Sequence, residues 1–388
     1  MRIRVCACVH ALLHVCACVH ALLRVYVRVP GVSTDDIIPL VFLAAEANDM
    51  QVAFHLEPYA GRTARRVGED VRYLLSRYGA ERALYRSPLR NNRTLFYVYD
   101  SYHISARDWR ETLRSLRGRG SGSGTSRDGS GSGSGSGASW DADFIALYLS
   151  PDSEADVLLA GFDGVYTYFA ASGFTYGSDP RHWPAVAEWA ARHGLLFVPC
   201  VGPGYDDTRI RPWNAHNLTL RRRGQHYRSQ WERALALVDS AHSQSQSHSL
   251  SQSQSQSHSD SHTHSQSQSQ SQSQSQSQSQ SQSPSLDPPP PPPLQLVHAV
   301  GISTYNEWGE GTQIEPAVPY TSPAGRTYAD YREDCGDGGG DCADGGGDCA
   351  HSGLYLAITK EYSMRFAVSI AHARLRSPPP VPSADVPL

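Results

Sequence analysis

The sequence predicts an α/β protein, a (β/α)8 TIM-type barrel that lacks its first two βα units. Three observations support this fold class. Short β-rich runs alternate with helical patterns along the chain, which is typical of βαβ units and a parallel sheet. Polar and aromatic residues gather where these runs end, as they do at the active-site face of such barrels. No Gly-rich phosphate turn follows the first run, which argues against a doubly wound nucleotide-binding sheet.

Six runs have the composition of buried strands, and helical patterns separate them. The expected strands are 51–57, 95–101, 144–150, 164–170, 195–201 and 297–304. The expected helices are 34–49, 63–79, 106–117, 153–160, 181–193 and 225–240. A closed barrel of this type needs eight strands, and residues 1–30 contain no convincing signal for the other two. We therefore expect a partial barrel over residues 31–375.

Length, charge and composition limit the class of protein. The chain has 388 residues, with 34 Lys and Arg against 38 Asp and Glu, and a formal net charge of −4. This balance argues against a nucleic-acid partner and against a polybasic membrane surface. Hydrophobic residues make up 39% and charged residues 19%, both low for a globular protein, because several stretches are of low complexity. The remainder is still large enough for one barrel of about 250 residues.

Low-complexity segments interrupt the barrel sequence in three places. Gly and Ser dominate 118–139, Ser-Gln alternation and a proline run fill 241–293, and Gly-Asp repeats with three cysteines occupy 334–351. Such compositions cannot repay their ordering entropy by burial, so we expect disordered linkers, followed at the end by a Pro-rich tail over 376–388. Their His and Cys residues match no metal-site spacing, and we expect no metal ion and no cofactor.

Residues 1–30 contain an imperfect tandem repeat, VCACVHALLH followed by VCACVHALLR. Its apolar run, 5–23, follows two arginines and has the form of a short signal anchor. A spurious repeat that arises from an error in the gene sequence explains the same pattern. Both interpretations stay open, and only the first implies a membrane anchor.

The densest group of polar side chains is STYNEWGEGTQIEPA, residues 303–317, directly after the last expected strand. Glu307 and Glu310 lie three residues apart in it, and Trp308 lies between them. Two carboxylates that converge on one site are what glycosidic cleavage needs, one to donate a proton and one to act as base or nucleophile. Trp308 offers an apolar face for a sugar ring. A solvated acidic loop is the alternative explanation for the two glutamates.

Four further blocks carry groups that suit hydroxyl-rich ligands. FHLEPYAGR contains His55, Glu57 and Tyr59, LFYVYDSYH contains Tyr99 and Asp100, GFDGVYTYFAASGFTYGS contains Tyr166, and VGPGYDDTRIRPWNAHN contains Arg211, Trp213 and Asn214. Loop packing and surface ion pairing are the alternative for the last group. The sequence contains no Ser-based nucleophile elbow, HExxH motif or Walker loop, which argues against serine hydrolases, zinc proteases and nucleotide enzymes.

Together these blocks resemble glycoside hydrolase family 99, the glycoprotein endo-α-1,2-mannosidases. The five blocks FHLEPYAGR, LFYVYDSYH, GFDGVYTYFAASGFTYGS, FVPCVGPGYDDTRIRPWNAHN and TYNEWGEGTQIEPA match the family pattern in its order, within 34–117, 140–240 and 294–375. The resemblance implies a (β/α)8 barrel that cleaves an internal α-1,2-mannosidic bond of glucosylated high-mannose N-glycans with retention. It also implies a Golgi membrane protein whose catalytic domain lies in the lumen.

The resemblance implies roles for individual residues as well. Glu307 is expected to deprotonate the 2-hydroxyl of the substrate, which then attacks the anomeric carbon to form a 1,2-anhydro sugar. Glu310 is expected to protonate the departing oxygen and then to activate water. The residues expected to bind substrate are His55, Glu57, Tyr59, Tyr99, Asp100, Tyr166, Arg211, Trp213, Asn214 and Trp308.

The sequence also departs from the family pattern. The first two βα units, with an aromatic Trp-Tyr-Gly loop and a later Trp-Tyr-Pro loop, have no counterpart, and position 309 is Gly where animal members commonly carry His. The alternative function is therefore an inactive, truncated remnant of the same fold that still binds glycans.

Overall fold

A computed structural model describes the backbone of 3–9 and 18–23, and residues 35, 37–87, 90–118, 140–238, 297, 299–316 and 353–376. The segments expected to be linkers, and the Pro-rich tail, lie almost entirely outside these residues. None of the helices in this described part of the chain is both long enough and apolar enough to cross a membrane.

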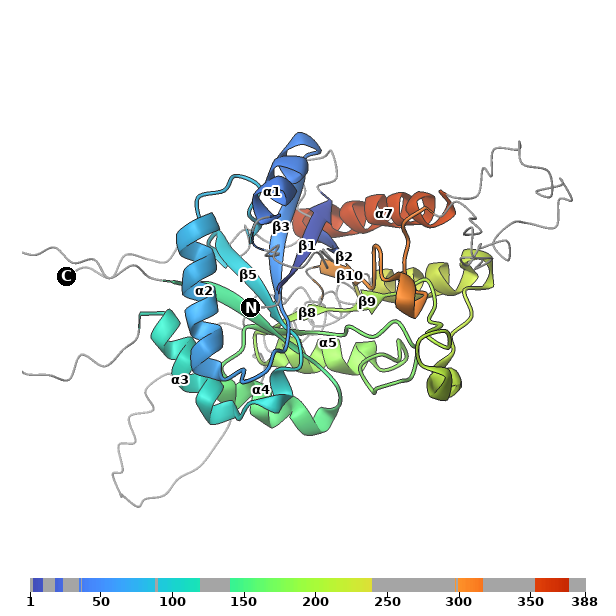
Figure 1. Ribbon diagram of the computed structural model, residues 1–388. Coiled ribbons are helices and arrows are strands. Elements are labelled where there is room, and N and C mark those ends of the chain that lie inside the picture. The colour runs from blue at the N-terminus through green and yellow to red at the C-terminus, as the bar shows by residue number, and fades with distance from the viewer. Residues whose placement is uncertain are drawn as a thin grey trace, which may run out of the picture.

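The core of the fold is a sheet that closes on itself (Figure 1). Its strands are β1 (Ile3–Val9), β2 (Cys18–Leu23), β3 (Met50–Leu56), β5 (Arg93–Val98), β6 (Ala142–Leu147), β7 (Gly164–Tyr166), β8 (Leu196–Val198), β9 (Cys200–Val201) and β10 (Ala299–Ile302). They follow the order β8-β7-β6-β5-β3-β1-β2-β10-β9, and the short β4 (Arg86–Ser87) pairs with β5 outside this order. Since β8 and β9 are two halves of one extended segment interrupted at Pro199, the order returns to its start as a ring of eight positions.

Helices surround the ring and connect its strands (Figure 1). They are α1 (Ile38–Ala47), α2 (Ala64–Tyr78), α3 (Ala106–Leu116), α4 (Glu154–Ala160), α5 (Trp183–Arg192), a helix over 225–238 and α7 (Leu354–Arg376). All six strands and all six helices expected from the sequence are present, with ends that differ by a few residues. The sequence analysis missed α7, although the buried side chains of this helix recur at intervals of three or four, as Tyr355, Ile358, Tyr362, Phe366 and Ile370.

The expectation of only six barrel strands is wrong, because β1 and β2 fill the two positions between β3 and β10. β2 runs parallel to β10, whereas β1 runs antiparallel to both β2 and β3, with Ile3 opposite Leu56. Without them β3 and β10 would present unpaired backbone groups along two open edges, which sheets avoid. β2, α1 and β3 follow one another as strand, helix and strand. Among the described strands of the ring, only β1 therefore departs from the alternation of parallel strands and helices.

Side chains alternate between the two faces of the strands. Phe54, Phe96 and Phe144 point outward toward the helices and stack with ring centroids 5.8 and 5.6 Å apart. Their neighbours His55 and Tyr97 point into the ring together with other buried side chains. The period of two in a strand therefore decides which residues reach the interior of the barrel.

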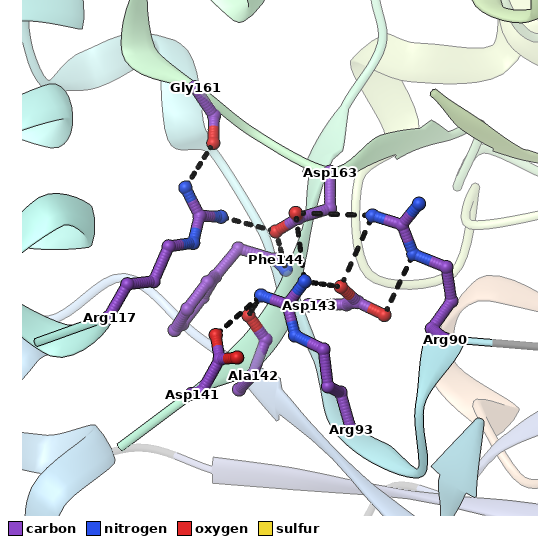
Figure 2. Close-up of polar contacts among 9 residues, drawn as sticks. All are labelled: Arg90, Arg93, Arg117, Asp141, Ala142, Asp143, Phe144, Gly161 and Asp163. Atoms are coloured by element: carbon purple, nitrogen blue, oxygen red, sulfur yellow. Dashed lines mark hydrogen bonds and ion pairs between the residues drawn. The ribbon is translucent and has the colours of Figure 1, made fainter. Parts of the chain in front are cut away.

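An ionic network holds the amino-terminal ends of β5, β6 and β7 (Figure 2). The Asp163 carboxylate accepts hydrogen bonds from the Phe144 N–H and Arg117, and it also contacts Arg90 and Arg93. The buried Asp143 lies 3.1 Å from Arg93 and 3.4 Å from Arg90. Burial first, and the Asp163 carboxylate second, raise the pKa of Asp143, while the two arginines oppose this. The network closes the end of the ring opposite to the expected site.

We expect Asp163→Ala to lower the free energy of unfolding by about 3 kcal/mol, because it leaves three guanidinium groups with fewer acceptors in a partly buried place. The matched control is Asp141→Ala, since Asp141 also pairs with Arg93 but is 45% exposed, against 11% for Asp163. Asp141→Ala should lower the free energy of unfolding by less than about 1 kcal/mol. Urea unfolding followed by circular dichroism measures both, and equal losses would contradict a structural role for the network.

Candidate active site

One group of expected site residues lies inside the ring at the carboxyl ends of its strands. We call His55, Glu57, Tyr99, Tyr166 and Tyr168 the interior cluster. The His55 ring is fully buried, with Nε2 2.8 Å from the Tyr166 hydroxyl and Nδ1 2.7 Å from Glu57 Oε1. Because β5 and β6 separate β3 from β7 in the ring, the His55–Tyr166 hydrogen bond crosses the interior of the barrel. It thus connects two strands that are not neighbours.

The proton positions in this chain of contacts follow from burial. Burial, and after it the nearby Tyr99 and Glu57, hold the pKa of Tyr166 well above its usual value. The phenol therefore keeps its proton at neutral pH and can donate it to Nε2 of His55. With Nε2 as the acceptor, the ring hydrogen of His55 lies on Nδ1, which faces Glu57 Oε1 at 2.7 Å. The Tyr99 and Tyr168 rings pack edge to face beside them, with centroids 4.9 Å apart.

A second group lies in the loops after β9 and β10. We call Tyr205, Asp207, Arg211, Asn214 and Glu310 the loop cluster. The buried Asp207 accepts hydrogen bonds from Asn214 at 2.9 Å, Arg211 at 3.0 Å and the Tyr205 hydroxyl at 2.9 Å. The same Nη1 of Arg211 also donates to Glu310 Oε1 at 3.1 Å. Arg211 is thus shared between a buried carboxylate and a more exposed one.

The charges in the loop cluster shift its titration. Burial would raise the pKa of Asp207, but the hydrogen bonds from Asn214, Arg211 and Tyr205 outweigh it, and the pKa lies below its usual value. Burial and the Glu310 carboxylate raise the pKa of Tyr205. At neutral pH Asp207 is therefore an anion that fixes Arg211, and Tyr205 stays protonated.

The loop that carries both candidate catalytic glutamates closes on itself. The Glu307 N–H donates to Thr304 Oγ1 at 3.1 Å, and the Thr304 N–H donates to the Thr312 carbonyl at 2.9 Å. Gly311 adopts a φ of 61°, and a Cβ there would lie 2.9 Å from the Asp206 carbonyl oxygen, so glycine is required. The Glu307 side chain is only 3% exposed.

Three further hydrogen bonds join this loop to the one after β9. The Asp206 N–H donates to the Glu310 carbonyl at 2.9 Å. Arg221 donates to the Gly311 and Gln313 carbonyls at 3.2 and 2.8 Å. The Glu310 carbonyl and the backbone that follows it are therefore held by the neighbouring loop.

The remaining expected site residues lie in different surroundings. The Tyr59 hydroxyl donates to Asp70 on α2, so burial and this carboxylate raise its pKa to about 12. Trp308 lies at the rim and donates to Glu315 at 2.7 Å, whereas Trp213 is 76% exposed. Asp100 lies in a left-handed turn after β5.

Two of the expected site residues are almost fully enclosed. His55 and Tyr166, expected to bind substrate, have almost no exposed surface in this structure and contact each other in the interior of the barrel. The sequence analysis singled out neither Tyr205 nor Asp207, the centre of the loop cluster. The Asp-x-x-x-Arg spacing of Asp207 and Arg211 was the available signal.

Comparison with known proteins agrees with this arrangement. Residues 10–247, more than half of the chain, match the profile of glycosyl hydrolase family 99. The chain belongs to glycosyl hydrolase family 99. The resemblance drawn from the sequence blocks is thus confirmed for the family, and the matched range contains the interior cluster. It ends before the loop that carries Glu307 and Glu310.

Individual members of family 99 are similar over most of the chain. A Mus musculus glycoprotein endo-alpha-1,2-mannosidase-like protein is 32% identical over 338 residues, 87% of this chain and 55% of that protein. A Rattus norvegicus glycoprotein endo-alpha-1,2-mannosidase is 31% identical over 344 residues, 87% of this chain and 54% of that protein. The chain spans about half the length of these curated relatives.

A solved structure supports the barrel. The GH99 endo-alpha-mannosidase from Bacteroides thetaiotaomicron superposes with a TM-score of 0.59 at 28% sequence identity, covering 87% of this chain and 73% of that one. The α/β barrel architecture expected from the sequence is therefore confirmed for this chain.

The lowered pKa of Asp207 predicts a pH dependence of stability. A carboxylate whose folded-state pKa is depressed stabilises the fold above its unfolded pKa, about 3.9, and loses this contribution as pH falls through the folded value. We expect Asp207→Asn to lower the free energy of unfolding by at least about 1 kcal/mol at pH 7, with a smaller difference from wild type below about pH 4.

The matched control is Asp206→Asn, because this neighbour is exposed and its carboxylate accepts hydrogen bonds from the adjacent Thr208. Denaturant unfolding at pH 7 and at pH 3 gives both differences. A difference for Asp207→Asn that is constant between the two pH values would contradict the assignment.

Proposed function

We propose that this chain is an endo-acting, retaining α-1,2-mannosidase that trims glucosylated high-mannose N-glycans. The observation that carries the proposal is the pair of glutamates on one loop at the carboxyl end of β10, in two different environments. Glu307 is buried on a self-closed turn, and Glu310 faces Arg211 nearer to the surface. Two carboxylates in contrasting surroundings suit an acid and a base with separate tasks.

The proposed reaction has two steps at the anomeric carbon. In the first, Glu307 takes the proton of the 2-hydroxyl, O2 bonds to C1, the bond from C1 to the leaving oxygen breaks, and Glu310 protonates that oxygen. The product is a 1,2-anhydro sugar. In the second step, water attacks C1 and gives a proton to Glu310, the C1–O2 bond opens, and Glu307 returns its proton to O2. Two inversions at C1 give overall retention.

Arg211 is relevant to the first step, because it contacts Glu310, which must donate a proton to the leaving oxygen there. In this structure Arg211 Nη1 lies 3.1 Å from Glu310 Oε1, so the leaving oxygen of the substrate must compete with the guanidinium for this carboxyl group. The bond of Arg211 to the buried Asp207 provides a place for the guanidinium when the contact with Glu310 opens. We propose that substrate entry moves Arg211 fully onto Asp207, which lets Glu310 act as the acid.

The relatives support the substrate class. The rat and mouse proteins are named for endo-α-1,2-mannosidase activity or likeness to it, and the bacterial structure is titled an endo-alpha-mannosidase. The polar groups at the carboxyl ends of the strands fit a polyhydroxylated ligand. Glycoproteins that carry such glycans are the proposed partners.

We also propose a Golgi location with the barrel in the lumen. Two sequons, at Asn92 and Asn217, are compatible with a secretory compartment, and Asn92 is exposed at the start of β5. Imaging of the tagged full-length protein should show co-localisation with a Golgi marker. A diffuse cytosolic signal would contradict this location.

The two glutamates have separable roles in this mechanism. We expect Glu310→Gln to reduce turnover of a natural glycan about 10²–10⁴-fold but to spare much of the activity on an α-mannosyl fluoride, which needs no proton to depart. We expect Glu307→Gln to abolish turnover of both substrates, because the epoxide cannot form without that base. Steady-state kinetics of purified full-length protein on both substrates measure the two patterns.

The control is Glu315→Gln, because Glu315 lies in the same loop but contacts Trp308 near the surface. Retained fluoride activity in Glu307→Gln, with loss in Glu310→Gln, would reverse the two roles. If wild type turns over neither substrate yet binds a glucosyl-mannose disaccharide in calorimetry, the glycan-binding remnant replaces the enzyme.

A further inference from the structure

Arg62 lies between two strand ends of the candidate site. It follows β3 in the loop that carries Glu57, and its Nη1 donates to the Tyr99 carbonyl at 2.7 Å in the turn after β5. The Tyr99 ring packs against His55, with centroids 5.5 Å apart, and His55 contacts Glu57. One guanidinium therefore joins the loops that carry Glu57 and Asp100.

The charge of Arg62 is not cancelled by an ion pair. Its Nε and Nη2 atoms are shielded from solvent and have no hydrogen-bond partner among the described residues. Its guanidinium lies 6.0 Å from the centre of the Trp109 ring, an apolar neighbour on α3. Such a partly buried cation acts on nearby anions through a medium that screens less than bulk water does.

Those anions are the two carboxylates of the site. Burial lowers the pKa of Arg62, and Asp100, Tyr166, Tyr59 and Glu57 act in the opposite direction, in that order of size. An arginine begins above about 12, so the side chain stays charged. Arg62 is therefore a positive charge held at the Tyr99 carbonyl, and the Asp100 and Glu57 carboxylates both act on it.

We propose that Arg62 is a positioning residue of the candidate sugar site: its guanidinium fixes the Tyr99–Asp100 turn against the Glu57 loop and keeps the Glu57 carboxylate ionised against His55. The inference rests on the proposed function, because Arg62 is proposed to hold the Glu57 and Asp100 carboxylates in one arrangement toward the hydroxyl groups of a bound sugar. Arg62 itself is assigned no contact with the sugar.

The experiment follows the Glu57 carboxyl by 13C NMR in full-length protein labelled at glutamate, with the signal assigned from Glu57→Gln. The titratable and charged groups that face Glu57, Tyr166 or Arg62 among the described residues are His55, Tyr59, Tyr97, Tyr99, Asp100, Tyr168 and Cys200. We expect Arg62→Met to raise the pKa of Glu57 by about one unit, a tenfold change in proton affinity, because a nearby positive charge is lost. Arg62→Lys should restore most of it.

Asp100→Asn provides a test of opposite sign. It removes a negative charge that also acts on Arg62. The loss of a nearby like charge favours the ionised form of Glu57, so the pKa of Glu57 should fall. The matched control is Arg66→Met, since Arg66 is exposed and bonds to the Gly61 carbonyl, and it should leave the titration unchanged. If Arg62→Met fails to fold, Arg62→Lys and Asp100→Asn carry the test. An unmoved titration in Arg62→Met, or a raised value in Asp100→Asn, would overturn the inference.

Kinetics separate this inference from the proposed function. With a glucosylated high-mannose glycan, Arg62→Met should raise KM about tenfold and change kcat less than about threefold, as expected for lost uniform binding. Hydrolysis by wild type together with unchanged KM in Arg62→Met overturns the inference and leaves the function intact. No hydrolysis by wild type, with the NMR shifts as expected, overturns the function and supports the positioning of Glu57.

Discussion

Closure of the strand ring is the constraint on which the rest of the structure depends. A sheet that ends in open edges exposes backbone N–H and C=O groups, and a ring pairs all of them. Here closure requires β1 and β2 between β3 and β10, although β1 runs against the direction of every other strand in the ring. With the ring closed, the carboxyl ends of the parallel strands all face one side, and their loops meet there.

The two ends of the ring differ in what they contribute. At the amino-terminal end, three arginines and two aspartates bind strands β5 to β7 to the end of α3, and no expected site residue takes part (Figure 2). At the other end, polar groups are organised in two clusters with different exposure. The His55–Tyr166 bond holds the interior, and Arg211 links the buried Asp207 to Glu310. Stability and chemistry are thus placed at opposite ends of one barrel.

Buried polar groups give the site its order. Glu57 contacts a histidine that has no exposed surface, and the Glu310 carbonyl and the backbone after it are hydrogen-bonded to the neighbouring loop. Each of these contacts costs desolvation, so each requires a partner at the right distance. The same need applies to Arg62, whose guanidinium donates to the Tyr99 carbonyl and so connects the loops after β3 and β5.

The sequence by itself determined the alternation of strands and helices, the barrel class, the family and the loop that carries Glu307 and Glu310. These features are local, because a strand run, a helical period and a motif each lie within a short stretch of chain. Tertiary structure decided the features that join distant stretches. The strands at 3–9 and 18–23 are recognisable only once the edges of β3 and β10 are known, and α7 shows its role only by packing on the ring. His55 and Tyr166 lie far apart in sequence, and only the closed barrel brings them together as buried hydrogen-bond partners.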